Sequence, residues 1–175
     1  MQATFVDIEN EFADLAEEVE HLSRFLDRLT QDGPSGESED TWAVSHVCAS
    51  ATEKTYTGCE RIMAKVASEV DRAPVAHSEG WHRAILLRMA NPFPGARSAV
   101  ISDECHRRLD RLRAFRHRER NSYGTHLDFD IVVARSREAV VTFGLFHQEV
   151  RAFFVAARDG DAIGPVMPEA PEGNV

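Results

Sequence analysis

The feature that most constrains the fold is a regular run of apolar residues near the N-terminus. Between residues 5 and 29, a large apolar side chain recurs at alternating intervals of three and four residues. This spacing follows the turn of an α-helix and predicts one amphipathic helix of about seven turns. The members of the stripe are Phe5, Ile8, Phe12, Leu15, Val19, Leu22, Leu26 and Leu29.

Two further helices are predicted before residue 91. The polar segment QDGPSGESED ends the first helix, because glycine, proline and serine favour loops. A second long helix is predicted from Trp42 to Val70, and Pro74 closes it. A short helix is predicted over 80–90. The segment NPFPGAR that follows it cannot form a regular helix or strand, because it contains two prolines. The seam of the second helix is predicted to be Val44, Val47, Ala51, Cys59, Ile62, Val66 and Val70.

A third long helix is predicted to begin after Ser102, since a serine followed by two acidic residues is typical of a helix N-terminus. Gly124 marks its end or a kink. The valine and isoleucine run at 131–133 has the composition of a strand, but a lone strand would have nothing to pair with. A fourth helix follows instead, with a seam of Phe143, Phe146, Val150 and Phe153.

These segments together predict an all-α protein. Four long amphipathic helices separated by turn signals make an antiparallel four-helix bundle, with a short extra helix after the second. We expect residues 1–158 to form this single domain. Residues 159–175 are rich in proline, glycine and acidic residues and have little apolar content, so we expect them to form a mobile tail.

The composition argues against several classes of protein. No apolar run approaches the roughly 18 residues that span a bilayer, and no secretory signal is visible, so we expect a cytoplasmic protein without a membrane partner. Cys48 and Cys59 are eleven residues apart and can share one buried helix face as free thiols. The histidines have no H-x-x-x-H or H-E-x-x-H spacing, so we predict no metal and no cofactor.

The charge of the chain is distributed unevenly. The net charge is −9, which disfavours general binding to nucleic acid. Residues 1–40 hold twelve acidic residues against two arginines, whereas residues 107–120 hold seven arginines against two acidic residues. The acidic chain therefore carries one concentrated cationic patch, on the third predicted helix.

The cationic patch interrupts the apolar seam of that helix. Residues three, four and seven apart share a helix face, so arginines occupy positions that should face a core. Guanidinium groups along one edge suit bidentate binding of phosphate, and a histidine among them can act as an acid or a base. The seam runs through Leu109, Leu112, Phe115, Arg116, Arg120 and Tyr123, with Arg113, His117 and Asn121 as a second stripe beside it.

A structural explanation of the patch stays open beside the functional one. Runs of charge are usually solvated helix faces, and these arginines could form ion pairs with the acidic residues of the first helix. Tyr56 and Glu60 lie one turn apart on the second helix and could face the patch. Such a pair is more often a contact on a helix surface.

The patch resembles the signature of HEPN-domain proteins, specifically the HepT-like toxins that pair with MNT-type nucleotidyltransferase antitoxins. The family signature is similar to F-R-H-x-x-R-H-x-Y followed by Leu-Asp. The chain reads FRHRERNSY over 115–123, followed by Leu127 and Asp128. Weaker similarity covers YTGCERIM at 56–63 and GWHRAILLRM at 80–89, and the resemblance extends over about residues 5–157.

The resemblance implies a homodimer in which two copies of the third helix line a cleft that binds RNA. It also implies a metal-independent endoribonuclease. An arginine steadies the charge on the phosphate, and a histidine five or six positions later transfers protons during attack by the ribose 2′-hydroxyl. Arg116 matches that arginine, and Arg113 and Arg120 are expected to bind phosphate. Tyr123 matches the tyrosine that the nucleotidyltransferase antitoxin can AMPylate.

The chain departs from the family at one position, because Asn121 replaces the histidine. An amide forms hydrogen bonds but does not exchange protons near neutral pH. The chain is then a natural variant with weak or no activity, an engineered inactive form, or an enzyme that uses another histidine. His117, one turn earlier on the same stripe, is a better substitute than His126, which lies past Gly124.

Three functions remain open at this stage. The first is a HepT-like toxin with weakened or absent endoribonuclease activity. The second is a non-catalytic, dimeric HEPN module that binds RNA, a nucleotide or a protein partner through the arginine patch. The third is a structural interaction protein in which the arginines pair with acidic residues of the first helix.

Overall fold

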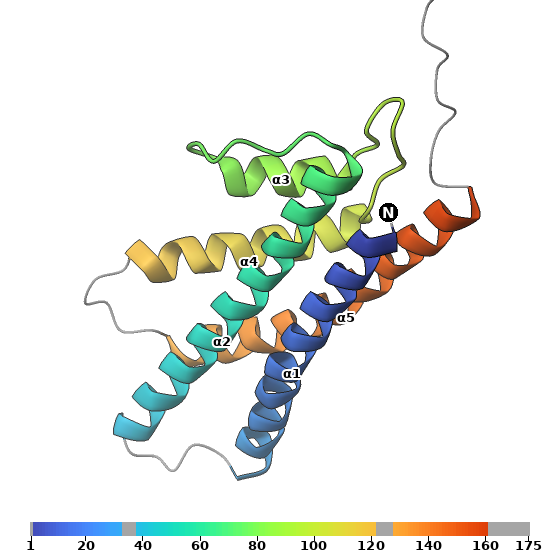
Figure 1. Ribbon diagram of the computed structural model, residues 1–175. Helices are drawn as coiled ribbons and strands as arrows, with labels where there is room; N and C mark the ends of the chain where they lie inside the picture. Colours follow the sequence, from blue (N-terminus) through green and yellow to red (C-terminus); the bar gives the residue numbers. More distant parts are fainter. Residues whose placement is uncertain (1, 33–37, 122–127, 161–175) are drawn as a thin grey trace, which may run out of the picture.

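A computed structural model describes residues 2–32, 38–121 and 128–160, and its regular structure within them is helical (Figure 1). The prediction of an all-α bundle with a short extra helix after the second long helix is confirmed. Residues 131–133 form part of a helix, and the described residues contain no strand. The elements are α1 (Gln2–Asp32), α2 (Ser38–Lys65), the π-helical turn η1 (Val66–Val70), α3 (Trp81–Ala90), α4 (Asp103–Asn121) and α5 (Phe129–Asp159).

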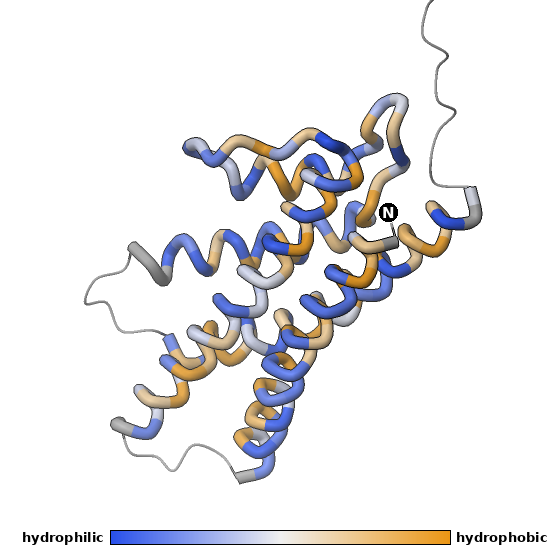
Figure 2. Tube along the Cα trace, in the orientation of Figure 1, coloured by the Kyte–Doolittle hydropathy of each residue, from blue (hydrophilic) through white to orange (hydrophobic). Residues whose placement is uncertain are grey.

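The core lies where α1, α2 and α5 pack together, with α4 on the other side of α2 and α5 (Figure 1). The predicted stripe of α1 faces this core, and its two end residues, Phe5 and Leu29, are half-buried. The Phe12 ring lies 6.1 Å from the Phe143 ring and 5.7 Å from the Phe146 ring, measured between centroids. Apolar residues follow the inner side of each long helix, whereas hydrophilic residues cover the outside (Figure 2).

The buried face of α2 differs from the predicted seam. Val47 was placed on that seam, but it is 51% exposed. Small and polar residues are buried in its place, and their hydroxyl groups have partners either on α2 itself or on α5. Thr52 forms a 2.9 Å hydrogen bond with Ser136 of α5, and Thr55 donates to the carbonyl of Ala51. Cys48 and Cys59 are buried as predicted.

A glycine brings α1 and α2 into close contact. A Cβ atom added at Gly58 would lie 2.6 Å from Leu15 Cδ2, which is too close for two carbon atoms. Leu15 is itself buried, so its side chain has little room to move away. The absence of a side chain at position 58 therefore sets the spacing of the two helices.

We expect Gly58→Ala to leave the protein about 1–3 kcal/mol less stable than Gly144→Ala, the typical cost of overpacking a core. Both glycines lie inside helices, so alanine brings the same gain in helix propensity at either position. A Cβ atom at Gly144 would meet nothing within 4 Å, which makes this variant the matched control. Urea denaturation measures the difference, and equal stability of the two variants would contradict the close contact.

The N-terminus of α4 is capped as predicted, with an additional contact from α5. Ser102 Oγ accepts a hydrogen bond from the backbone N–H of Cys105 at 3.1 Å. The Glu149 carboxylate of α5 accepts from both the backbone N–H of Ser102, at 2.7 Å, and its hydroxyl, at 2.6 Å. The cap thereby joins the start of α4 to α5 through two residues that are 47 positions apart.

The C-terminal end of α5 is closed by a glycine. The helix ends at Asp159, and Gly160 adopts a left-handed conformation after it, with φ of 89°. Residues 161–175, most of the predicted tail, lie outside the described residues, as does Gly124, the predicted end of α4. The division into residues 1–158 and 159–175 stays a prediction.

A buried ion pair fixes the segment that connects α3 to α4. Arg97 Nε lies 2.5 Å from Asp71 Oδ1, Arg97 Nη2 lies 3.0 Å from Oδ2, and neither side chain is exposed. The same guanidinium donates to the carbonyls of Arg88, Asn91 and Ser98. Burial of two charges is tolerated here because both are paired and hydrogen-bonded.

Candidate functional site

The arginines of α4 pair with acidic residues on three helices, but α1 is not one of them in the described part of the chain. The expectation that they pair with the acidic first helix is therefore wrong for the described side chains. Glu9, Glu11, Glu18 and Glu20 of α1 pair instead with basic residues of α1, α2 and α5. The α4 pairs are Arg107 and Arg108 with Glu104, Arg111 with Glu138, Arg113 with Asp110 and Arg116 with Glu53.

Arg116 is the most enclosed of these arginines, with 13% of its side chain exposed. It continues the apolar seam of α4 one position after the buried Phe115 and points toward α2 and α3. Its Nε lies 3.4 Å from Glu53 Oε1 on α2. Its Nη1 lies 3.5 Å from Nε2 of His82 on α3.

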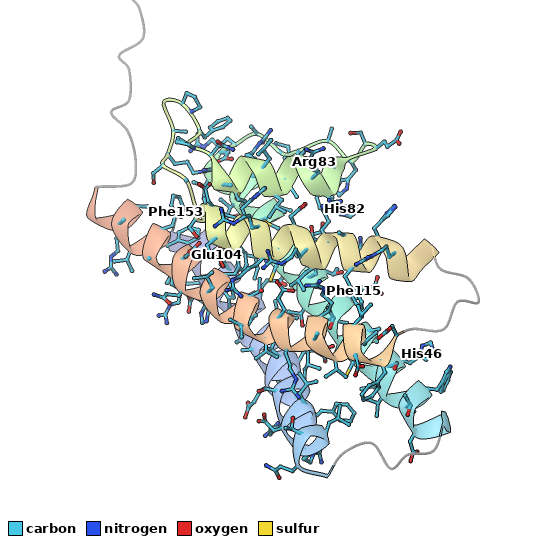
Figure 3. The ribbon with its side chains drawn as sticks, turned by 180° about the vertical axis from the view of Figure 1, so that it is seen from behind. His46, His82, Arg83, Glu104, Phe115 and Phe153 are labelled. Carbon is cyan, nitrogen blue, oxygen red and sulfur yellow. The ribbon has the colours of Figure 1, made fainter. Side chains whose placement is uncertain are left out.

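His82 forms a second pair with a buried carboxylate. Its Nδ1 lies 2.5 Å from Glu60 Oε1 on α2. Only 4% of the Glu60 side chain is exposed, whereas 42% of the His82 side chain is exposed. Figure 3 places His82 between α3 and α4, far from His46 near the N-terminal end of α2. Three helices thus bring Glu60, His82 and Arg116 together, and we call these residues the Glu60–His82–Arg116 cluster.

The cluster borders an open cavity of about 700 Å³. Aromatic rings form one side of this cavity: His77 stacks on Trp81 at 4.4 Å, and Trp81 meets His82 edge-on at 5.0 Å, between centroids. Trp81 Nε1 donates to the carbonyl of Val75 at 3.0 Å, which fixes the indole ring. The cavity therefore combines a guanidinium, an imidazole and aromatic faces, which suit a phosphate and a base of an RNA strand.

Tyr56 lies behind the cluster, one turn before Glu60 on α2. The tyrosine is fully buried, so the expectation of a pair on the helix surface is wrong. Burial, and then the neighbouring Glu60 carboxylate, raise the pKa of Tyr56, so its hydroxyl keeps its proton. The protonated hydroxyl lies beside Glu60 but has no hydrogen-bond partner among the described residues.

The predicted site residues occupy different surroundings. Arg113 is partly exposed and bonds Asp110 on its own helix at 2.8 Å. His117 is exposed and does not line the cavity beside Arg116. Asn121 is the last residue of α4, but its side chain and that of Arg120 lie outside the described part of the structure. Tyr123 and His126 also lie outside the described residues.

Sequence reasoning did not identify His82 as a partner of Arg116. The two residues are 34 positions apart, and Glu60 is 22 positions from His82, so no local spacing connects them. One signal was present, because both weaker similarity segments, at 56–63 and 80–89, contain a cluster residue.

The described residues contain no group of histidine, cysteine or acidic side chains that could hold a metal ion. None of their helices has the length and apolar character that crossing a membrane requires.

A family model described as HepT-like protein matches residues 47–157. The matched region contains Glu60, His82 and Arg116, together with α3 and α4. No curated protein and no solved structure matches the chain.

Proposed function

Because the chain belongs to the family of HepT-like proteins, we propose that it is the toxin component of a toxin–antitoxin system. We propose further that it acts as a metal-independent endoribonuclease, weakened by Asn121 at the position of the family histidine. The observation that carries the proposal is the placement of Arg116. This arginine is held at the edge of a cavity beside His82, rather than on a solvated helix face.

In the proposed reaction, the 2′-hydroxyl of a ribose attacks the adjacent phosphate. The Arg116 guanidinium stabilises the negative charge that develops on the phosphate oxygens, where a fixed charge is most effective. Arg113 and Arg120 bind neighbouring phosphates of the strand. A homodimer brings two copies of α4 together around the RNA, and the proposed location is the cytoplasm.

The proposed partner is an MNT-type nucleotidyltransferase antitoxin, since HepT-like proteins generally act in toxin–antitoxin pairs. AMPylation of Tyr123, two positions after Asn121, would add a negatively charged phosphate to the site. That charge would compete with RNA for the arginines and silence the protein.

We expect Arg116→Ala to lower the rate of RNA cleavage in EDTA by about 100- to 1,000-fold, the typical cost of removing one donor to a developing oxyanion. The measurement is cleavage of single-stranded RNA at equal protein concentrations. Arg118→Ala is the matched control, because Arg118 is exposed on the same helix and should leave the rate unchanged. Absence of cleavage by both the chain and an Asn121→His variant would contradict the ribonuclease proposal.

Asn121 favours one alternative, a dimeric HEPN module that binds RNA, a nucleotide or a protein partner without cleaving it. Such a module would bind RNA through the same arginines, and its affinity would fall steeply as salt increases. Binding without cleavage, in both the chain and Asn121→His, would support this alternative.

A further inference from the structure

The buried Glu60 carboxylate is paired with a histidine that is itself partly exposed, and structural support alone does not require this exposure. A carboxylate as deeply buried as Glu60 needs a partner, because an unpaired buried charge is very costly. That partner is a histidine with 42% of its side chain exposed at the cavity, instead of a buried arginine or lysine. The pair therefore connects a buried charge to a surface that a ligand can reach.

The hydrogen-bond partners assign the protons on His82. With the Glu60 carboxylate as acceptor, a neutral His82 carries its proton on Nδ1 and donates it to Glu60. A guanidinium only donates, so Nε2 presents its lone pair toward Arg116 Nη1 at 3.5 Å. The carboxylate thus holds one nitrogen of the imidazole, and the other nitrogen carries a lone pair. This is the arrangement of a general base that a neighbouring residue keeps oriented.

The orientation of the imidazole ring is fixed from two sides. Glu60 holds Nδ1, and Trp81 meets the ring edge-on at an interplanar angle of 76°. Trp81 is fixed in turn by its bond to the Val75 carbonyl and by His77 stacked on its face. A base held in this way loses little freedom when a substrate arrives.

We propose that His82 is the general base of this site and takes over the proton transfer that Asn121 cannot perform. The inference rests on the proposed ribonuclease function. His82 Nε2 lies 3.5 Å from Arg116 Nη1, so in the proposed complex a phosphate on Arg116 would have its neighbouring 2′-hydroxyl within reach of this nitrogen. His117 is a weaker candidate, because it is exposed and does not line the cavity.

The proposed step balances without a metal or a redox partner. His82 Nε2 takes the proton of the 2′-hydroxyl, and the 2′-oxygen forms a bond to phosphorus. The bond between phosphorus and the 5′-oxygen breaks, and the leaving oxygen takes a proton from water. The products are a 2′,3′-cyclic phosphate and a 5′-hydroxyl end, and His82 returns its proton to solvent. Glu60 acts as a positioning residue, since it holds the ring and does not touch the RNA.

The test measures RNA cleavage in EDTA by His82→Gln, in the native chain and in an Asn121→His background. We expect a loss of about 100- to 10,000-fold in the native chain, the typical contribution of a general acid or base. We expect a much smaller loss in the Asn121→His background, because a histidine at position 121 supplies the missing base. His46→Gln is the control, since His46 is an exposed histidine remote from the cavity (Figure 3).

Several outcomes would overturn the role of His82. An equal loss in both backgrounds would indicate that the residue only supports the structure, and no loss in the native chain would exclude it as the base. Cleavage by Asn121→His but not by the native chain would contradict the role of His82 as the general base and leave the proposed function intact. No cleavage by either would contradict both proposals. If His82→Gln fails to fold, Glu60→Gln tests the role of His82 in its place. We then expect a lower rate of RNA cleavage in the native chain and little change in the Asn121→His background.

Discussion

Asn121→His should raise the rate of RNA cleavage, by as much as about 100- to 10,000-fold if no other group performs proton transfer in the chain itself. Asparagine cannot accept a proton from the 2′-hydroxyl near neutral pH, whereas histidine can. The substitution adds no charge to the neutral form of the side chain, so binding of RNA should change little. The measurement is the cleavage rate in EDTA, with saturating RNA.

The size of this gain is informative in itself. A gain near the upper limit would mean that the native chain has no working base, whereas a small gain would mean that another residue already supplies one. Asn121→Gln is the matched control, because it keeps an amide that cannot exchange protons. An equal gain in Asn121→Gln would contradict proton transfer as the cause.

Asp71→Asn should lower the free energy of unfolding by about 3–5 kcal/mol, the usual cost of removing one partner from a buried ion pair. Asparagine has nearly the same shape as aspartate, so the loss comes from the charge. Arg97 would remain with no exposed surface and no counter-ion in the described structure around it. A typical domain is stable by only about 5–15 kcal/mol, so the variant would lose a large share of its stability.

An exposed ion pair provides the comparison for this substitution. Lys54 lies 3.2 Å from Glu18, but the two side chains are 63% and 37% exposed. Lys54→Ala should cost no more than about 1 kcal/mol, as is usual for pairs in contact with water. Urea denaturation of both variants measures the difference. A cost for Asp71→Asn as small as that for Lys54→Ala would show that water reaches Arg97 in solution.

The helices were predictable because their signals are local. The stripe of α1 repeats every turn, and Ser102 with the two acidic residues after it has the composition of a helix N-terminus. Both signals lie within a few residues of the structure that they determine. The resemblance around Arg116 likewise rests on a contiguous segment, and the family match supports it.

The buried polar contacts were not predictable from local patterns. Thr52 reaches Ser136 over 84 positions, and His82 reaches Arg116 over 34. Hydrophobic periodicity gives a polar residue no reason to be buried, so it assigned Val47 to the core of α2 in place of its polar neighbours. The sequence also left open whether Glu60 faces the arginine patch or a helix surface, because no residue near it in sequence indicates the pairing with His82.

The contact of Glu149 with Ser102 has a consequence for the synthesis of the chain. Residues of α4 are synthesised before those of α5, so the start of α4 lacks its second anchor during that interval. α4 also packs against α2, α3 and α5, so the part of its surface that α5 covers waits for that helix. The 38 residues from the end of α4 to the end of α5 take roughly 2–8 s to translate at typical rates of about 5–20 residues per second. For those seconds, the contacts that α5 makes with α4 are missing from the nascent chain.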